Sequence, residues 1–244
     1  MDTALTIKNI AVQRGGKSIL NDVNLTVTAG SCCGLVGLNG AGKSTLIHAV
    51  LDLLPTRQGA VTLFDIPWTD PASREQLAYL PERYRFSDRF TGADMLRGLL
   101  RFHGVVWQYD AVVSMLNDLG LSEVLLKKPL GQLSKGTVQR LGLASIFLSQ
   151  RKLLILDEPM SGLDPLARSC FRAALKNYQQ GGGTIFFNTH LLHDVNVLCD
   201  HMAILHEGTI VFDGAPDSCQ EQFGADTLES AFLKIIKVQL SSTS

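Results

Sequence analysis

A glycine-rich stretch near the N-terminus has the residue types and spacing of a phosphate-binding loop. It reads Gly37-Leu38-Asn39-Gly40-Ala41-Gly42-Lys43-Ser44-Thr45 and lies between an apolar run and a segment with helical spacing. Glycines let a backbone curl so that its N–H groups point at phosphate oxygens, and the N-terminus of a helix adds positive potential. We expect Lys43 to reach the β- and γ-phosphates of a nucleotide and Ser44 to ligate Mg²⁺. The Lys-Ser pair and both flanks disfavour an ordinary glycine-rich turn.

Two adjacent carboxylates follow an apolar run in the second half of the chain. The run is Leu153-Leu154-Ile155-Leu156, and Asp157 and Glu158 come directly after it. Successive side chains of a strand point in opposite directions, so the two acids can have different roles. We expect Asp157 to hold Mg²⁺ through water and Glu158 to polarise the attacking water. Without the phosphate-binding loop, an ordinary strand ending in polar residues would explain the pattern equally well.

A second candidate anion site lies at the stretch Leu133-Ser134-Lys135-Gly136-Thr137. Ser134 fits the N-cap of a helix that continues through Leu148. The unpaired N–H groups at such an N-terminus attract an anion. Two phosphate-binding helix N-termini in one chain make sense if each serves a different nucleotide across a dimer. Taken alone, the stretch predicts only a capped helix.

Two further polar groups complete the set of candidate residues. Ser161-Gly162-Leu163-Asp164 comes shortly after the acidic pair, and Asp164 precedes a proline at an expected helix start. His190 follows an expected strand at its carboxyl end, where a side chain can face the ligand cleft of an α/β sheet. A single histidine at such a position is usually structural, so its interpretation depends on the other motifs.

Hydrophobic spacing predicts an α/β core interrupted by helices. A helix is expected over 44–54, ended by Pro55. Mostly helical structure is expected from Thr91 to about Gln150, beginning with Thr91-Gly92-Ala93-Asp94, which resembles a capping box with Asp in place of the usual Glu or Gln. We predict one domain over 1–244, with the α/β core in 1–84 and 151–244 and a helical subdomain in 85–150. The other expected elements are strands near 5–7, 25–27, 33–36, 60–64, 152–156 and 184–188, a hairpin over 202–212 and a helix over 228–236.

Composition limits the classes of protein that the chain can belong to. Its 244 residues contain 22 Lys and Arg and 23 Asp and Glu, a balance that argues against a dominant nucleic-acid surface. No apolar stretch approaches the length of a membrane-spanning helix, and the N-terminus lacks the pattern of a secretion signal. The five cysteines form no C-x-x-C pair, which favours reduced thiols of a cytosolic protein.

In this order, the motifs resemble those of the ATP-binding cassette (ABC) ATPases over nearly the whole chain. The resemblance implies a P-loop NTPase core, with a mixed sheet, flanking helices and an N-terminal antiparallel β part, and an inserted helical subdomain. It implies two ATP molecules held between two cassettes, in a homodimer or a heterodimer. Ser134 and Gly136 would then contact the partner's γ-phosphate, His190 would contact the γ-phosphate in its own site, and Asp164 would communicate between the sites.

Some positions differ from the family's usual pattern. Glu82, in Leu80-Pro81-Glu82, stands where many relatives have Gln, and we expect it to ligate Mg²⁺ or water. Arg14 stands where an aromatic residue would stack on adenine, and its planar guanidinium can stack there instead. The Pro-Glu and Ser-Lys-Gly stretches, with Thr227-Leu228-Glu229 near the end, resemble exporters of the type-two ABC class.

The resemblance implies an ATPase subunit that powers transport, most simply export, through a separate transmembrane permease. Such a subunit lies at the cytoplasmic face of the membrane, and we expect the permease to dock near Glu82–Phe90. Tyr84, Phe86 and Phe90 would form its apolar seat, unless they pack internally. The alternatives are a soluble ABC ATPase acting on ribosomes or nucleic acid and a small-molecule phosphotransferase. The first usually carries two cassettes or basic arms, and the second leaves the Leu-Ser-x-Gly stretch unexplained.

Overall fold

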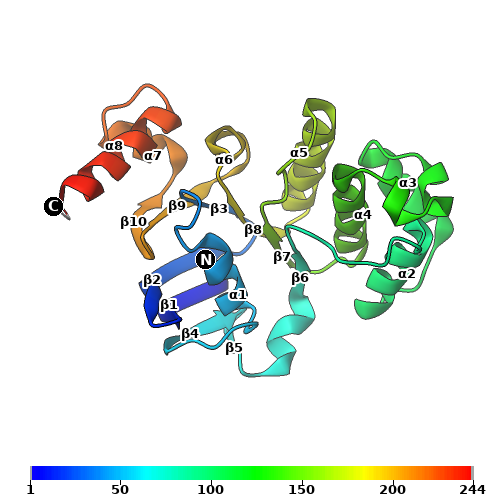
Figure 1. Ribbon diagram of the computed structural model, residues 1–244, viewed down its shortest axis with the longest axis horizontal. Helices are drawn as coiled ribbons and strands as arrows, with labels where there is room; N and C mark the ends of the chain where they lie inside the picture. The colour runs from blue at the N-terminus through cyan, green and yellow to red at the C-terminus, as the bar shows by residue number, and fades with distance from the viewer. Residues whose placement is uncertain (1, 243–244) are drawn as a thin grey trace. The chain divides into compact units, whose positions relative to one another are not determined.

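The computed structural model describes residues 2–242, which form two compact units (Figure 1). The first unit contains the residues up to Glu75 and those from Thr184 onward. The second unit is the continuous segment Gln76–Gly183. The chain therefore leaves the first unit once and returns to it after completing the second.

The first unit begins with an antiparallel sheet of strand order β2-β1-β4-β5. The two long strands are β1 (Thr3–Arg14) and β2 (Lys17–Thr28), joined by a tight turn. The shorter strands are β4 (Gln58–Leu63) and β5 (Ile66–Pro67). In β2, the alternate residues Val23, Leu25 and Val27 are buried, as expected for a sheet with one covered face.

A second group of strands in this unit is mainly parallel. Strand β3 (Cys32–Val36) lies between β8 (Thr184–Thr189) and β9 (His201–His206) and is parallel to both. Strand β10 (Thr209–Gly214) pairs with β9 in an antiparallel hairpin. Every residue of β3 and β8 is buried, the pattern of strands covered on both faces. Three helices from the end of the chain complete the unit: α6 (Leu192–Leu198), α7 (Pro216–Gln222) and α8 (Leu228–Ser242).

Helix α1 (Lys43–Val50) follows β3 and is shorter than the predicted 44–54. The prediction of its end was wrong because Asp52 has a left-handed backbone with φ of 55°. The N–H of Leu53 then donates to the carbonyl of His48 at 2.8 Å, which closes the helix. Leu53 is 64% exposed, so its apolar side chain does not continue the buried face.

The second unit contains two parallel strands and four α-helices. Strands β6 (Leu77–Leu80) and β7 (Leu153–Asp157) pair in register, with Leu80 opposite Leu156. A short 3₁₀ helix, η1 (Pro71–Gln76), precedes β6. Helix α5 (Pro165–Gln180) follows β7 and ends at the glycine turn before β8.

The structure between these two strands is mainly helical, as predicted. Helices α2 (Gly92–Phe102) and α3 (Tyr109–Asp118) both pack on α4 (Lys135–Leu148), and the three lie side by side in Figure 1. Two 3₁₀ turns, η2 (Glu123–Lys127) and η3 (Leu130–Gln132), connect α3 to α4. These elements lie within the same unit as β6, β7 and α5, and the subdomain limits of 85–150 remain a proposal.

A capping box fixes the start of α2. Thr91 Oγ1 accepts a hydrogen bond from the N–H of Asp94 at 3.2 Å, and the Asp94 carboxylate accepts one from the N–H of Thr91 at 2.9 Å. The backbone bond lowers the pKa of Asp94. The predicted capping box is therefore confirmed, with Asp as the acid.

We expect Thr91→Ala to destabilise the second unit by about 1 kcal/mol, because it removes this cap. The measurement is urea denaturation followed by circular dichroism. The control is Ser114→Ala, which removes an exposed hydroxyl inside α3, where alanine is a better helix former. Equal stability of the two variants would show that the cap contributes nothing measurable.

Candidate nucleotide-binding site

The glycine-rich loop joins β3 to α1 in a conformation that requires glycine. Gly40 and Gly42 have left-handed φ angles of 83° and 110°. A Cβ at position 37 would lie 2.4 Å from the carbonyl oxygen of Leu205, so only glycine allows this close approach to β9. The loop is therefore curled tightly on the end of the parallel strands. No side chain caps the N-terminus of α1, whose N-cap is Gly42.

Lys43 lies within this curled loop. Its side chain is buried, and Nζ donates hydrogen bonds to the carbonyls of Gly37 at 2.8 Å and Leu38 at 3.3 Å. Ser44 and Thr45 are half-buried in the first turn of α1, while Asn39 is exposed on the loop. A buried cation within a curled glycine-rich loop is the arrangement that a nucleotide's phosphates need.

A pocket of about 510 Å³ opens beside the loop. The loop contributes Leu38–Ala41 to its lining, β2 contributes Lys17–Ile19, and the β9–β10 hairpin contributes His206–Gly208. The sequence analysis missed Lys17, a cation placed beside the candidate phosphate site. Its only sequence signal was its position directly after the Gly-Gly turn. Arg14, the candidate adenine contact, is exposed on the other side of that turn and is not among the lining residues.

The β9–β10 turn supports the loop from the side. The N–H of Gly208 donates to the carbonyl of Ala41 at 3.2 Å, and the Gly208 carbonyl accepts from the N–H of Asn21 at 2.8 Å. Gly208 has φ of 80°, and a Cβ there would lie 2.4 Å from the carbonyl oxygen of Ile19. The turn can therefore link the loop to β2 only with glycine at this position.

His190 lies at the same strand edge as the start of the loop. In the parallel pairing of β3 and β8, Val36 is opposite Thr189, so Gly37 and His190 both directly follow paired residues. His190 is exposed. Within the first unit, the structure thus brings together the loop, Lys43, Ser44 and His190, the candidate contact of the γ-phosphate.

The candidate metal and catalytic carboxylates lie at one edge of the second unit. Because Leu80 is opposite Leu156, Glu82 and the pair Asp157 and Glu158 follow the carboxyl ends of neighbouring parallel strands. Burial, then the charges of Asp157 and Glu82, raise the pKa of the Tyr79 hydroxyl well above its usual value. Both carboxylates are therefore close enough to the Tyr79 ring to act on it electrostatically.

Asp157 and Glu158 differ in backbone conformation and exposure, because β7 ends between them. Asp157 is buried at the end of β7, whereas Glu158 is half-buried. Glu158 has φ of 46°, a left-handed conformation that is costly for a residue with a side chain. Strained backbone of this kind is concentrated at functional sites, where the surrounding structure enforces it.

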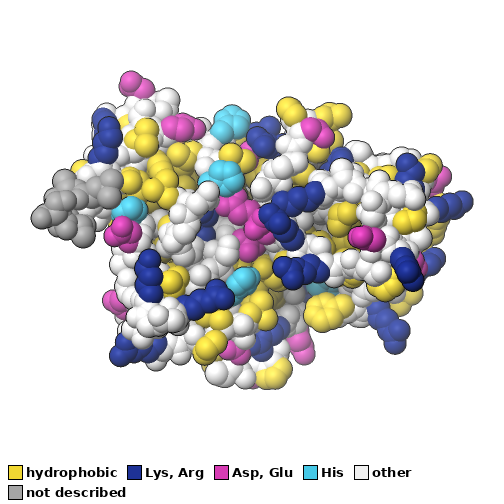
Figure 2. All heavy atoms as spheres, viewed as in Figure 1, with side chains coloured by type: hydrophobic (Ala, Val, Ile, Leu, Met, Phe, Trp, Pro, Cys, Tyr) yellow, Lys and Arg dark blue, Asp and Glu magenta, His cyan; other side chains and the backbone are white. Residues whose placement is uncertain are grey.

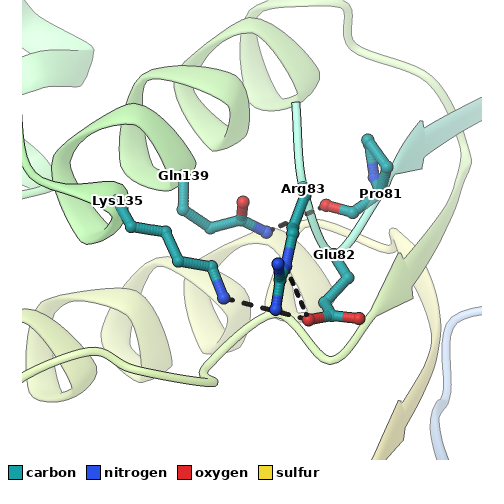
Figure 3. A network of polar contacts seen from close by, with 5 residues as sticks. All are labelled: Pro81, Glu82, Arg83, Lys135 and Gln139. Atoms are coloured by element: carbon teal, nitrogen blue, oxygen red, sulfur yellow. Dashed lines mark hydrogen bonds and ion pairs between the residues drawn. The ribbon is translucent and has the colours of Figure 1, made fainter. Parts of the chain in front are cut away.

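Glu82 is already paired with two cations (Figure 3). Its Oε1 lies 3.3 Å from Arg83 Nε and 3.8 Å from Lys135 Nζ. Neither of the two cationic neighbours that offset the charge of Glu82 was identified from the sequence. Lys135 belongs to the Leu-Ser-x-Gly stretch, so this ion pair joins two of the candidate motifs.

Ser134 caps α4, as predicted. Its Oγ accepts a hydrogen bond from the N–H of Thr137 at 3.1 Å. A Cβ at Gly136 would lie 3.2 Å from the side chain of Leu163, so the N-terminus of α4 is close to the Ser161–Asp164 stretch. Asp164 itself caps α5, accepting from the N–H of Ala167 at 2.8 Å.

The donor set of the chain suits Mg²⁺, which prefers hydroxyl and carboxylate oxygens and is usually held by one or two carboxylates, phosphate and water. The candidates are the Ser44 hydroxyl in the first unit and the Asp157 and Glu82 carboxylates in the second. Among residues 2–242, no group of three or more His, Cys, Asp and Glu side chains is placed to hold a metal alone.

The surface shown in Figure 2 has Lys and Arg side chains interspersed with Asp and Glu side chains, in keeping with the formal net charge of −1. Within residues 2–242, no helix has both the length and the apolar character needed to span a membrane.

The fold and the glycine-rich loop define a P-loop ATPase. Residues 20–161 match the profile of the ABC transporter family, and the chain belongs to that family. Members hydrolyse ATP to power transport, so the chain is the ATP-binding and ATP-hydrolysing subunit of an ABC transporter. The predicted fold class and enzyme class are thereby confirmed.

Three similar proteins support this assignment. The Nod factor export ATP-binding protein I of Sinorhizobium fredii is 32% identical over 93% of this chain and 68% of its own length. The lantibiotic transport ATP-binding protein SrtF of Streptococcus pyogenes is 31% identical over 93% of this chain and 95% of its own length. A solved ATP-binding subunit of an ABC transporter is 29% identical, with a TM-score of 0.86 over 96% of this chain and 99% of that chain.

The support that Gly208 gives to the loop predicts a specific effect of Gly208→Ala. The left-handed conformation costs a residue with a Cβ about 1–2 kcal/mol, and the contact with Ile19 forces the turn to move. Because the turn holds Ala41, we expect ATP to bind about tenfold more weakly, the equivalent of about 1.4 kcal/mol. The measurement is titration with a fluorescent ATP analogue.

Gly104→Ala is the matched control, because Gly104 has φ of 73° but a Cβ added there would meet nothing within 4 Å. We expect it to lower the melting temperature without changing ATP affinity. Equal ATP affinity of the two variants would contradict a role for the β9–β10 turn in the nucleotide site.

Proposed function

We propose that the chain is one of two cassettes that together drive a separate transmembrane permease, most simply in export. The two relatives named above are described as acting in Nod factor export and lantibiotic transport, which supports this direction. The chain would lie at the cytoplasmic face of the membrane as a peripheral subunit. It forms one cassette over 1–244, with its α/β core in 1–84 and 151–244 and its helical subdomain in 85–150.

The observation that most supports paired cassettes is the presence of two helix N-termini suited to phosphate, in different units of the chain. The N-terminus of α1 follows the glycine-rich loop, and that of α4 carries Ser134 and Gly136. A cassette that binds ATP at its own loop has a second phosphate site left for the ATP of its partner. Ser134 and Gly136 would contact that partner ATP, and Asp164 would link the two sites.

Within its own site, each residue has a distinct proposed role. Gly37, Asn39, Gly40, Ala41, Gly42 and Thr45 surround the phosphates, and Lys43 offsets the charge of the β- and γ-phosphates. His190 contacts the γ-phosphate, and Glu158 accepts a proton from the attacking water. Ser44, Asp157 and Glu82 would hold Mg²⁺, which when bound offsets the negative charge of the phosphates.

Arg14 is the proposed contact of the adenine base. A stacked guanidinium would not read the hydrogen-bonding edge of the base, so Arg14 would select weakly between ATP and GTP. Lys17, which lines the pocket, is the second candidate for a contact with the nucleotide.

The proposed seat of the permease is smaller than the sequence suggested. Tyr84 is packed on α4, because a Cβ at Gly142 would lie 2.0 Å from its ring. Phe86 contacts the Tyr84 ring at 5.7 Å between centroids and is half-buried, whereas Phe90 is 48% exposed. We therefore propose Phe86 and Phe90, and not Tyr84, as the side chains that a permease helix would contact.

Glu158→Gln tests the catalytic assignment. We expect it to bind ATP with unchanged or higher affinity and to slow hydrolysis by roughly 10²- to 10⁴-fold, the usual effect of removing a general base. The variant should accumulate as an ATP-bound dimer in light scattering with MgATP. Glu229→Gln, an exposed acid in the first turn of α8, is the control and should hydrolyse ATP at the wild-type rate. Wild-type hydrolysis by Glu158→Gln would rule out the assignment.

Ser134→Arg tests the sandwich of two cassettes. Its long cationic side chain should block closure on the partner's ATP and leave binding to the single chain intact. Placed in the Glu158→Gln background, it should abolish the ATP-bound dimer while a fluorescent ATP analogue still binds. Ser87→Arg, on an exposed loop, is the control for added charge. A dimer that persists in the Ser134→Arg double variant would exclude α4 from the dimer interface.

A further inference from the structure

Helix α4 presents one face to the loop that follows β6. Lys135, Gln139 and Gly142 are spaced by four and three residues, so they lie along one side of the helix. The buried side chain of Gln139 donates from Nε2 to the carbonyl of Pro81 at 3.1 Å (Figure 3). This buried hydrogen bond is one of the points at which the helix holds the loop.

A second point of contact is the ring of Tyr84. It lies so close to Gly142 that a Cβ there would be 2.0 Å from ring carbon Cε2. Burial raises the pKa of the Tyr84 hydroxyl well above its usual value. Residues on both sides of Glu82 are therefore held firmly against α4.

The Glu82 carboxylate lies between these two fixed points and is bound more loosely. Its side chain is 40% exposed, that of Lys135 is 50% exposed, and their charged atoms are 3.8 Å apart. Figure 3 shows the Lys135 and Arg83 side chains converging on the same carboxylate. Half-exposed ion pairs are weak, so this carboxylate can exchange one cation for another.

We propose that Lys135 is a positioning residue that holds Glu82 against the first turn of α4 in competition with Mg²⁺. The proposal rests on the proposed function, in which Glu82 is a metal ligand. The fixed backbone at Pro81 and Tyr84 keeps Glu82 within reach of either cation. Mg²⁺ that binds the carboxylate is repelled by the ammonium group beside it, so Lys135 lowers the affinity of the site for Mg²⁺.

The position of Lys135 also links the two nucleotide sites of a dimer. It occupies the first turn of α4, next to Ser134, where a phosphate of the partner's ATP would bind. Such a phosphate attracts the ammonium group and releases Glu82 to the metal of its own site. Closure of the dimer on the nucleotide of one site thereby favours Mg²⁺ binding at the other site. By thermodynamic linkage, Mg²⁺ binding at that site also favours closure.

The test measures nucleotide binding, without hydrolysis, at protein concentrations where light scattering shows a monomer. The affinity for a fluorescent non-hydrolysable ATP analogue is measured with Mg²⁺ and with EDTA, and the ratio gives the contribution of the metal. We expect Lys135→Met and Lys135→Gln to raise this ratio about two- to fivefold, the range for a half-exposed ion pair. We expect Lys135→Arg to keep it near the wild-type value.

A double-mutant cycle separates an effect through Glu82 from a general effect of charge. Glu82→Gln should lower the ratio, and adding Lys135→Met to it should produce no further change. Lys128→Met, which removes an exposed lysine of the same unit, should leave the ratio unchanged.

The possible failures are distinguishable. If Lys135→Met matches Lys128→Met while Glu82→Gln lowers the ratio, the positioning role is overturned and the metal assignment stands. If the Lys135→Met effect persists in the Glu82→Gln background, Lys135 acts through a general effect of its positive charge and not through Glu82, which also overturns the proposal. If Glu82→Gln has no effect, the metal assignment of Glu82 is itself wrong, and the role of Lys135 falls with it.

Discussion

The site depends on a close approach of two backbones, that of the phosphate-binding loop and that of β9. At Gly37 the loop passes so near the carbonyl of Leu205 that no side chain fits between them. The left-handed turns at Gly40 and Gly42 then reverse the chain into α1. Because every residue of β3, the strand that leads into the loop, is buried, the loop has a rigid base, and its N–H groups are fixed before any phosphate binds.

The other candidate groups lie at strand ends for the same geometric reason. Parallel strands in register bring their carboxyl ends to one edge, so residues far apart in sequence become neighbours. In the first unit this places His190 beside the start of the loop, and in the second it places Glu82 beside Asp157 and Glu158. The register of β6 and β7 is therefore enough to bring the three acids to one edge. The acids differ from one another in backbone conformation and in burial.

The sequence predicted the elements well wherever the hydrophobic period was clear or a specific cap was present. The buried strand before the loop, the Thr91 capping box and the Ser134 and Asp164 N-caps are all in the structure. The end of α1 was predicted wrongly, because the left-handed backbone conformation of Asp52 leaves no trace in the hydrophobic periodicity.

Contacts between segments distant in sequence were also beyond prediction. Lys17 lines the pocket because β2 runs beside the β9–β10 hairpin, and nothing in its own neighbourhood of the sequence indicates this. The sequence analysis considered Lys135 only as part of the Leu-Ser-x-Gly stretch, whereas its partner Glu82 lies in another motif 53 positions earlier (135 − 82). Pairing of this kind depends on tertiary packing, which hydrophobic periodicity does not encode.

Different positions along helix α4 have different roles. Its first turn carries the proposed second phosphate site, while Gln139 and Gly142 further along hold the loop that follows β6. The absence of a side chain at position 142 lets the Tyr84 ring lie directly on the helix backbone, and close-packed contacts of this kind deform little. A displacement of the loop must therefore move the whole helix, including Ser134. In this arrangement, one rigid element joins the loop near the proposed permease contact to the N-terminus that we propose contacts the partner's ATP.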